Sequence, residues 1–520
     1  MNQPEFVSYA EAVMDVLSAT PERPVVTTAD GTHLTAGEFR DSTCRLAGEL
    51  ADRGAGRGTT VALLTGNTAE ALGARYAAHL AGARVVNLYD GMSAPALADI
   101  VTSADTDMLL VDREQYAAVK ELRSLVDVPV VLALGPGSAE EDVVAASARQ
   151  PARPPAVRIA PDDHRSIRHT GGTTGIPKGI LALHGSYRRA LDSPLGDRGD
   201  RPRYLACTSI AHLAGLYADL HLYRGGSVVL QRGFDPGEVL AAIERERITH
   251  IWLLPPQLYQ LLDHPALAGT DLSSLRRLAY GGCPASPARL REALDVFGPV
   301  LESGYGQAEA QNITALAPHE HGRTGHDGRI SVGRAVPGVQ LAVRDADGTT
   351  LPPGEQGEIQ VRSPGVMPGY WKRPDLTAEV LQDGWLRTGD LGYLDEDGYL
   401  YVVDRLRDVI IVVGGHVCPS ELEELLLTHP AVARVAVFGV RDADAVEHVH
   451  AAVVPAPGHQ PDQPDRAAVQ AAVQASVQEF VTARKGRMHA PEEVHLVDDI
   501  PLTAAGKPDR NLLRSLGRNQ

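Results

Sequence analysis

The stretch TGGTTGIPKG, residues 170–179, is the most informative part of this sequence. Its glycines let backbone amides turn towards an anion, as they do in loops that cradle phosphate. Its threonines add hydroxyl donors, and Lys178 adds a positive charge. A strand-like run at 166–170 leads straight into the loop. The stretch therefore predicts a phosphate-binding loop at the end of a strand, with a flexible surface loop as the alternative.

The loop differs from the common nucleoside-triphosphatase loop, in which Gly-Lys-Ser/Thr closes the glycine-rich spacer. Here Pro177 precedes Lys178, and Gly179 follows it. A kinase or a GTPase therefore loses its main sequence support. The proline also restricts the backbone beside the lysine, which argues against a merely flexible loop.

Outward from the loop, helical and strand-like patterns alternate. Phe39, Leu46 and Leu50 recur at helical spacing, and Asn67 or Thr68 can cap a second helix. Strands that alternate with helices predict crossover connections and largely parallel, buried sheets. The strand-like runs lie at 61–64, 85–88, 109–111, 128–134 and 227–230.

The pattern changes after about residue 331. Short alternating segments follow, and Asp-Gly pairs at 347–348, 383–384 and 397–398 separate them. Such pairs are typical of tight turns between antiparallel strands. This part of the chain is therefore predicted to form an antiparallel β region.

The last part of the chain has the pattern of a compact α/β unit. A helix opens near Pro419, a strand follows at 432–437, and a second helix runs over 465–484. Together these patterns predict an α/β protein. Its large N-terminal domain, residues 1–407, combines mixed or parallel sheets and flanking helices with the antiparallel β region. A small C-terminal α/β domain, residues 408–520, follows it.

The composition is that of an acidic globular protein. The 520 residues are 43% hydrophobic and 22% charged, and 49 Lys and Arg against 66 Asp and Glu give a net charge of −17. A nucleic-acid backbone or an anionic membrane needs a basic face, so neither is expected as the main partner. The N-terminus lacks a basic start with a long apolar run, and the four cysteines lack paired spacing. We therefore expect a cytoplasmic protein with free thiols.

Further motifs follow the loop in order. They read ESGYGQAEA (302–310), WLRTGDLGY (385–393), DRLRDVIIVVGGHVCPSELE (404–423) and PLTAAGKPDR (501–510). With these motifs the chain resembles the adenylate-forming superfamily of acyl- and aryl-CoA synthetases, peptide-synthetase adenylation domains and firefly luciferase. The resemblance covers essentially the whole chain. It implies that a carboxylate attacks the α-phosphate of ATP, and that a thiol then displaces AMP from the acyl-adenylate.

The resemblance implies residues for the phosphates and the metal ion. Glu309 is expected to ligate the Mg²⁺ that bridges phosphate oxygens, because magnesium prefers hard oxygen ligands. Thr174 is also expected to take part in catalysis. The residues implied to hold the pyrophosphate end of ATP are Thr170, Gly171, Gly172, Thr173, Thr174, Gly175 and Lys178.

The resemblance also implies a nucleoside site and a mobile lid. Asp390 and Arg405 are expected to bind the ribose, and Lys507 to bridge the reacting carboxylate and the α-phosphate. Asp408 falls at the hinge after which the C-terminal domain would rotate, bringing Gly414 to the tunnel for the pantetheine arm. Tyr305 is implied to stack on adenine, with Gly281 and Gly282 letting the backbone approach the ring, and Gly306 is also implied to bind the nucleotide.

The acid-binding pocket is expected to include His212, in SIAHLAGLY (209–217), which matches a position that gates the acyl or aryl site in many synthetases. A core histidine with a backbone partner is the alternative. The segment lacks the Phe-Asp pair with which amino-acid adenylation domains hold an α-ammonium group. A small aliphatic or aromatic carboxylic acid is therefore favoured as the substrate. The other segments expected at the pocket are 252–256, 280–284 and 303–313.

Some positions depart from the usual pattern. Ala308 replaces the threonine that most members carry before the magnesium ligand, and Arg168-His169 stands where an aromatic residue is common. Ile411 occupies a position where luciferase-like members have a lysine that assists the second step. These departures leave the final acceptor open.

The leading functional prediction is an AMP-forming acid–thiol ligase that uses ATP, Mg²⁺ and coenzyme A. The phosphopantetheine thiol of an acyl carrier protein, or a nitrogen nucleophile, is the alternative acceptor. A non-catalytic nucleotide-binding relative is a second alternative, for which Ala308 is the sequence support. A homodimer is left open as an assembly.

Overall fold

The computed structural model describes residues 6–89, 92–169, 178–192, 201–283, 285–326, 328–412, 415–442, 447–457, 466–503 and 508–516. The chain forms two compact units. Unit 1 consists of Met1–Gly282, Ala288–Glu320 and Ser363–Gly384, and unit 2 consists of Cys283–Pro287, His321–Arg362 and Trp385–Gln520. The predicted boundary at residue 408, between the N-terminal domain and a mobile C-terminal lid domain, stays a prediction.

Unit 1 contains two seven-stranded sheets of the predicted, largely parallel kind. The first has the order β14-β13-β12-β10-β11-β1-β2, and its strands are parallel except at the edge pair β1–β2. Its inner strands are buried over most of their length, as expected of parallel strands covered on both faces. The strands are β1 (Pro24–Thr27), β2 (His33–Thr35), β10 (Arg203–Ala206), β11 (Ser227–Leu230), β12 (His250–Leu253), β13 (Arg277–Tyr280) and β14 (Leu301–Ser303).

The second sheet of unit 1 has the order β7-β6-β5-β3-β4-β8-β9. Its strands are also parallel, except for the antiparallel pair β8–β9 at one edge. That pair flanks the glycine-threonine loop, so the predicted strand before the loop is confirmed. The strands are β3 (Thr60–Leu64), β4 (Arg84–Leu88), β5 (Met108–Val111), β6 (Val130–Ala133), β7 (Glu141–Asp142), β8 (His164–His169) and β9 (Gly179–Leu183).

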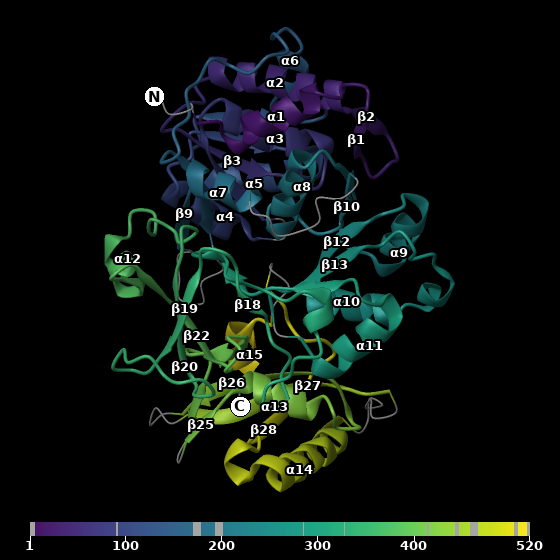
Figure 1. Ribbon diagram of the computed structural model, residues 1–520, viewed down its shortest axis with the longest axis vertical. Helices are drawn as coiled ribbons and strands as arrows, with labels where there is room; N and C mark the ends of the chain where they lie inside the picture. Colours follow the sequence, from purple (N-terminus) through teal and green to yellow (C-terminus); the bar gives the residue numbers. More distant parts are fainter. Residues whose placement is uncertain are drawn as a thin grey trace. The chain divides into compact units, whose positions relative to one another are not determined.

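Several helices of unit 1 begin where the sequence supplies a cap. Thr35 caps α2 and Thr68 caps α3, each by accepting a backbone N–H of the first turn. The predicted apolar residues of α2, Phe39, Leu46 and Leu50, are buried, and α1, α2 and α3 pack together (Figure 1). The helices are α1 (Tyr9–Ser18), α2 (Ala36–Asp52), α3 (Ala69–Leu80), α4 (Ala94–Ser103), α5 (Tyr116–Leu125), α6 (Val143–Ser147), α7 (His184–Asp192), α8 (Leu213–Tyr223), α9 (Pro236–Arg245), α10 (Pro255–Leu262), α11 (Pro287–Phe297) and α12 (Pro374–Val380).

Unit 2 contains the predicted antiparallel region. Strands β19, β20, β22 and β23 follow one another across the sheet, and each pair is antiparallel. Glycines of the predicted Asp-Gly turns, Gly348 and Gly398, have φ of +83° and +79°, a conformation that glycine adopts without strain. The strands are β19 (Gln340–Arg344), β20 (Gly357–Arg362), β22 (Trp385–Leu394) and β23 (Leu400–Arg405).

The C-terminal part of unit 2 is the predicted α/β unit. Strand β27 lies between antiparallel β26 and parallel β28, and α14 covers one face of this sheet (Figure 1). The helices predicted at Pro419 and over 465–484, and the strand predicted at 432–437, are all present. No helix among the described residues is both long and apolar enough to cross a bilayer. The elements are β24 (Ile410–Val412), β25 (Gly415–Val417), α13 (Pro419–Leu426), β26 (Val432–Arg441), β27 (Glu447–Pro455), α14 (Arg466–Lys485), β28 (Glu493–Leu496) and α15 (Arg510–Leu516).

Candidate active site

Predicted site residues follow neighbouring strands of the first parallel sheet. Gly281 comes directly after β13, Tyr305 follows β14, and His212 lies beyond β10 at the start of α8. In the adjacent strands β13 and β14, Tyr280 is paired with Ser303. Ligands of open α/β sheets bind outside the carboxyl ends of the strands. The topology of unit 1 therefore brings these residues to the edge where a ligand is expected.

The glycines after β13 allow the backbone to come close to its neighbour. A Cβ atom on Gly281 would lie 3.2 Å from the carbonyl oxygen of Gly304, and Gly282 has φ of +85°. The backbone N–H of Tyr305 donates to Thr314 Oγ1 at 3.1 Å, which holds the residue beside these glycines. The predicted adenine site requires that the backbone of these residues be closely approached, which glycine permits.

The glycine-threonine loop joins two antiparallel strands that hold its ends. His169 at the end of β8 is paired with Gly179 at the start of β9. A Cβ atom on Gly179 would lie 2.7 Å from Ile167 Cγ2, so this position requires glycine. The predicted site residues Thr170, Gly171, Gly172, Thr173, Thr174 and Gly175 lie outside the described residues.

Tyr370 contacts both Lys178 and Glu309, two predicted site residues of opposite charge. The Lys178 Nζ atom lies 5.3 Å from the centre of the Tyr370 ring. The Tyr370 hydroxyl donates to Glu309 Oε1 at 3.1 Å. A cation over an aromatic face is attracted by the ring's quadrupole, so the ring stabilises Lys178 without neutralising it. Unit 1 therefore brings a cation and a carboxylate to the same tyrosine.

Backbone hydrogen bonds hold Tyr370 in this position. The Trp371 N–H donates to the Gly179 carbonyl at 2.7 Å, which extends the β8–β9 ladder. The Met367 N–H donates to the Glu309 carbonyl at 2.7 Å. No role for Tyr370 is predicted from the sequence. The adjacent aromatic pair of 370 and 371 was the available signal, but its partners lie far away in the chain.

Glu309 stands in the turn of a short hairpin formed by β15 (Gly306–Gln307) and β16 (Gln311–Asn312). A Cβ atom on Gly306 would lie 2.4 Å from the Gln311 carbonyl oxygen, so a side chain at Gly306 would force the strands apart. Gly306 therefore has a structural reason to be glycine, in addition to its predicted place in the nucleotide site. The hairpin gives the Glu309 carboxylate its position next to Tyr370.

His212 stacks on Tyr89. The ring centres lie 4.0 Å apart with an angle of 10° between the planes, and the Tyr89 hydroxyl donates to the His169 carbonyl at 3.1 Å. Burial, with a smaller contribution from Arg168, lowers the pKa of His212 to about 4. The imidazole is therefore neutral at pH 7 and presents an aromatic surface rather than a cation.

Aromatic side chains also gather in the segments predicted to bind the acid. The rings of Tyr217 and Trp252 are stacked with centres 6.4 Å apart. A Cβ atom on Gly282 would lie 3.1 Å from Leu254 Cδ2 and 3.8 Å from Trp252 Cζ2, so this glycine faces apolar side chains. Such surroundings suit an apolar acyl or aryl group better than a charged one.

Asp390 and Arg405 form an ion pair in unit 2. They are paired residues of the adjacent strands β22 and β23, and Arg405 Nε lies 2.7 Å from Asp390 Oδ1. The Asp390 side chain is 4% exposed and that of Arg405 is 40% exposed. A carboxylate held in this way has lone pairs left for other donors. The two residues predicted to bind the ribose are therefore neighbours.

Arg510 anchors the segment that follows Lys507. Its Nη1 lies 3.0 Å from Asp408 Oδ2 and 3.9 Å from Asp404 Oδ1, and its Nη2 lies 3.2 Å from Glu423 Oε1. The predicted hinge residue therefore contacts the start of α15. Lys507 itself, and Gly414, lie outside the described residues.

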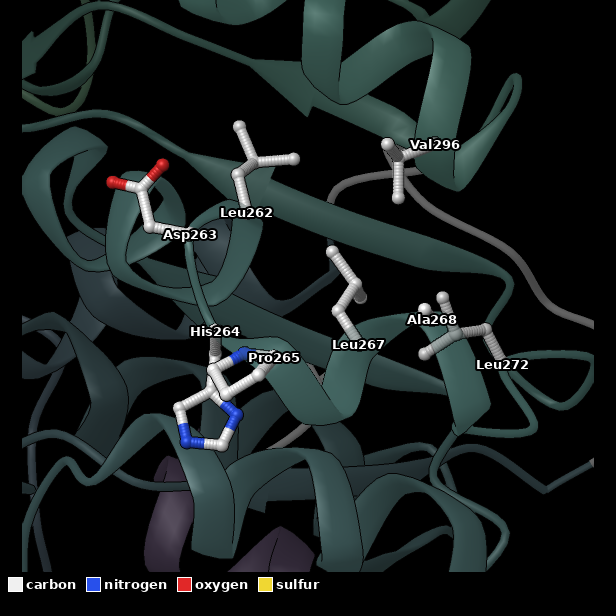
Figure 2. A pocket seen from close by; sticks show the side chains of 8 residues that line it. All are labelled: Leu262, Asp263, His264, Pro265, Leu267, Ala268, Leu272 and Val296. Atoms are coloured by element: carbon white, nitrogen blue, oxygen red, sulfur yellow. The ribbon is translucent and has the colours of Figure 1, made fainter.

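A separate cavity in unit 1 does not include any predicted site residue. Figure 2 shows this cavity of about 470 Å³, which is lined by apolar residues such as Leu262, Leu267, Leu272 and Val296. It lies around α10 and α11 rather than at the carboxyl ends of the strands. We therefore do not assign the predicted chemistry to it.

The chain combines two largely parallel sheets, an antiparallel region and a C-terminal α/β unit, and Lys178 and Glu309 both contact Tyr370. This combination is that of the adenylate-forming class of enzymes. The chain belongs to the AMP-binding enzyme family. Residues 14–371 match the AMP-binding enzyme domain, and residues 421–507 match the AMP-binding enzyme C-terminal domain. The resemblance that the motifs indicated is thereby confirmed.

Known relatives extend over nearly the whole chain. The medium/long-chain-fatty-acid–CoA ligase FadD8 of Mycobacterium tuberculosis is 36% identical, over 97% of this chain and 89% of its own length. The fatty acid–[acyl-carrier-protein] ligase ScoC of Streptomyces coeruleorubidus is 32% identical, over 95% of this chain and 93% of its own length. The structure of the amide bond synthetase McbA from Marinactinospora thermotolerans superposes with a TM-score of 0.85 at 39% identity, covering 98% of this chain and 99% of that one.

Proposed function

We propose that this chain uses ATP to convert an aliphatic or aromatic carboxylic acid into its acyl-adenylate, and then transfers the acyl group to the thiol of coenzyme A. The meeting of Lys178 and Glu309 at Tyr370 is the observation that carries this proposal. A cation and a hard carboxylate ligand beside a glycine-threonine loop are what the polyphosphate of ATP and its magnesium ion need.

In the first half-reaction, a carboxylate oxygen of the acid attacks the α-phosphorus of ATP, and the bond to the β-phosphate breaks. Negative charge then grows on the departing pyrophosphate, and Lys178 with the loop 170–177 stabilises it. Glu309 would hold the magnesium ion, which would supply positive charge to the phosphate oxygens when bound with the nucleotide. Lys507 contacts the reacting carboxylate and the α-phosphate. The substrates supply every bond that changes, so these residues position and stabilise groups rather than form covalent links.

The remaining predicted residues place the nucleoside and the acid. Asp390, oriented by Arg405, accepts hydrogen bonds from the ribose hydroxyls. Tyr305 stacks on adenine, and Gly281 and Gly282 let the ring approach the backbone. The acid lies among Tyr217, Trp252 and His212, whose neutral rings favour an apolar aliphatic or aromatic group. Which acid of this class is used depends on the pocket's length, since one methylene changes discrimination only modestly.

In the second half-reaction, the thiolate of coenzyme A attacks the acyl carbon, and the bond to AMP breaks. Residues 408–520 act as a mobile lid that rotates at Asp408 between the half-reactions and brings Gly414 to the pantetheine arm. The thiolate rather than the thiol is the nucleophile, so the site is expected to help the thiol lose its proton. We further expect a cytoplasmic enzyme, for which a carrier protein and a homodimer remain candidate partners.

Amide formation is a second candidate for the second half-reaction. The 39% identity to an amide bond synthetase over 98% of this chain favours it. So does Ile411, which is 60% exposed on β24 at the position where luciferase-like members carry a lysine that assists thiol transfer. An amine would attack the same acyl carbon through its neutral nitrogen, lose a proton and release AMP. The first half-reaction and its residues would be unchanged.

The test is acid-dependent pyrophosphate release from ATP and magnesium, with a panel of aliphatic and aromatic acids. Each active acid is then assayed with coenzyme A, with a pantetheinylated carrier protein and with a primary amine, and the product is identified by mass spectrometry. Steady turnover to an acyl-CoA supports the proposal. Turnover that yields only the amide, or only the acylated carrier protein, would show that the amine or the carrier protein is the acceptor instead of coenzyme A. Acid-independent release, or ATP binding without release for every acid, contradicts the adenylation half itself.

A further inference from the structure

A cluster of metal-ligating side chains lies in unit 2, and the proposed reaction does not use it. His450, Glu493 and His495 each offer one ligand atom, and these atoms all lie within 4.8 Å of one another. His450 is on β27, and Glu493 and His495 are on β28. Imidazole nitrogen together with carboxylate oxygen is a common donor set for zinc in proteins.

The strand register explains why these side chains meet. Strands β27 and β28 are parallel, and His450 is paired with Glu493. His495 is two residues beyond Glu493 and therefore lies on the same face of the sheet. Phe438, the partner of His450 on β26, lies on that face too, at 5.9 Å from the His450 ring and 6.0 Å from the His495 ring. The cluster thus has a rigid sheet as its base and an apolar ring at its side.

The distances between the ligand atoms match a tetrahedral site. His450 Nδ1 lies 3.1 Å from His495 Nε2, and Glu493 Oε2 lies 3.7 Å from His450 Nδ1 and 3.6 Å from His495 Nε2. Metal–ligand distances of about 2.0–2.1 Å in a tetrahedron place neighbouring ligand atoms about 3.3–3.4 Å apart. The three atoms therefore outline one face of such a tetrahedron with only small adjustments.

The side chains of His450 and His495 are buried, so the base of the cluster is shielded from solvent. A hydrogen bond between the two nitrogens alone would explain their 3.1 Å separation, but it would not require the Glu493 carboxylate at nearly equal distances from both.

We propose that His450, Glu493 and His495 bind one divalent cation of the zinc type, with a fourth position for water. Imidazole ligands select the later divalent metals of the first row over magnesium, so the site is separate in chemistry from Glu309. The ion would link β27 to β28 and thereby stabilise the C-terminal part of unit 2. This role is independent of the proposed ligase reaction.

The experiment titrates the full-length, tag-free, metal-stripped chain with zinc in the presence of excess magnesium, which keeps carboxylate sites occupied. Calorimetry gives affinity and stoichiometry, and anomalous scattering at the zinc edge of a crystal locates the ion. We expect one zinc ion between His450, Glu493 and His495, and a higher unfolding temperature with zinc than with magnesium alone. Absence of saturable binding, or an ion located elsewhere, overturns the proposal.

Variants distinguish this site from the nearby cluster around His448, which lies on β27 as His450 does. Glu493→Gln changes a partly exposed carboxylate, which keeps the fold intact, and His495→Asn removes a nitrogen ligand. Loss of a residue that only orients a metal ligand weakens metal binding about 10- to 100-fold. We expect each of these variants, which lose a ligand itself, to weaken zinc binding by at least that factor. The control is His448→Asn, because His448 pairs with Asp442 and Glu492 instead. Loss of binding in the control with retention in the other variants would place the ion in the wrong cluster and overturn the assignment.

Discussion

The charged residues around Tyr370 in unit 1 are arranged differently from those around Arg405 and Arg510 in unit 2. In unit 1, Lys178 and Glu309 each contact the Tyr370 side chain, Lys178 near its ring and Glu309 through its hydroxyl. In unit 2, Arg510 contacts carboxylates directly, and Asp390 pairs with Arg405. An ion pair neutralises its own charges, whereas a cation over a ring keeps its charge for a ligand. The difference indicates that the Tyr370 site leaves its cation available to a substrate, while the ion pairs around Arg510 and Arg405 hold chain segments in place and orient Asp390.

The largest expected effect tests whether unit 2 also contributes to the chemistry. Lys507→Ala should slow acid-dependent pyrophosphate release by about a thousandfold, since one transition-state donor is typically worth 10²–10³ in rate. The measurement is pyrophosphate release, with circular dichroism to confirm that the fold is intact. The matched control is Lys485→Ala in the same unit, where the ammonium pairs with Glu421 at 3.4 Å. An unchanged rate in the Lys507 variant would refute its role.

The second prediction concerns the anchoring role of unit 2. Arg510→Met should destabilise this unit by about 3 kcal/mol, because it leaves carboxylates that were paired with a mostly buried guanidinium. Arg514→Met is the control, since its guanidinium is 3.8 Å from Asp408 and its side chain is 32% exposed, so about 1 kcal/mol or less is expected. Urea unfolding followed by Trp385, with the other tryptophans replaced, reports unit 2. Equal destabilisation by both substitutions would contradict the anchor.

The third prediction is that buried histidines make unit 1 sensitive to acid. Burial lowers the pKa of His169 and His212 to about 4 and that of His184 to about 3. In the unfolded chain these side chains take up protons near their ordinary pKa of about 6.5. The stability that they contribute is therefore complete above about pH 6.5 and is lost progressively as the pH falls towards 4.

The measurement is the urea midpoint of unit 1 at about pH 7.5 and at about pH 5, with a lower midpoint expected at the acidic pH. A Trp385→Phe variant leaves Trp252 and Trp371 as reporters of this unit. In unit 2, hydrogen bonding to Asp442 raises the pKa of His448, so that residue contributes in the opposite sense: its stabilisation is present at low pH and lost as the pH rises. A midpoint of unit 1 that does not fall at the acidic pH would contradict the assignment of neutral, buried histidines.

The smallest expected effect concerns the tyrosine between the charges of unit 1. Tyr370→Phe removes the hydrogen bond to Glu309 and keeps the ring beside Lys178. Because such a bond contributes about 0.5–1.5 kcal/mol, the Mg–ATP concentration for half-maximal rate should rise about two- to tenfold. Tyr370→Leu also removes the ring and should raise it further, by the cation–π contribution of about 0.5–1 kcal/mol. Identical kinetics for the wild type and both variants would show that Tyr370 does not organise the site.

Much of the fold could be predicted because its determinants are local. The cap at Thr68, the apolar spacing of Phe39, Leu46 and Leu50, and the Asp-Gly turns each act within a few residues. The structure places the corresponding helices and turns as predicted. Tyr370 could not be predicted in the same way, because its contacts depend on pairing with β9, far earlier in the chain.

The ordered motifs identify the class of enzyme and predict a set of site residues, because they carry the glycines, the acids and the lysines that this chemistry requires. Which of these residues lie close together follows from the tertiary structure alone. It paired Asp390 with Arg405 across two strands, brought Lys178 and Glu309 to Tyr370, and gathered His450, Glu493 and His495 on one face of a sheet. The physical reason is that a motif can be identified from the residue types within a short stretch of sequence. Contacts between distant residues depend instead on strand register and sheet order.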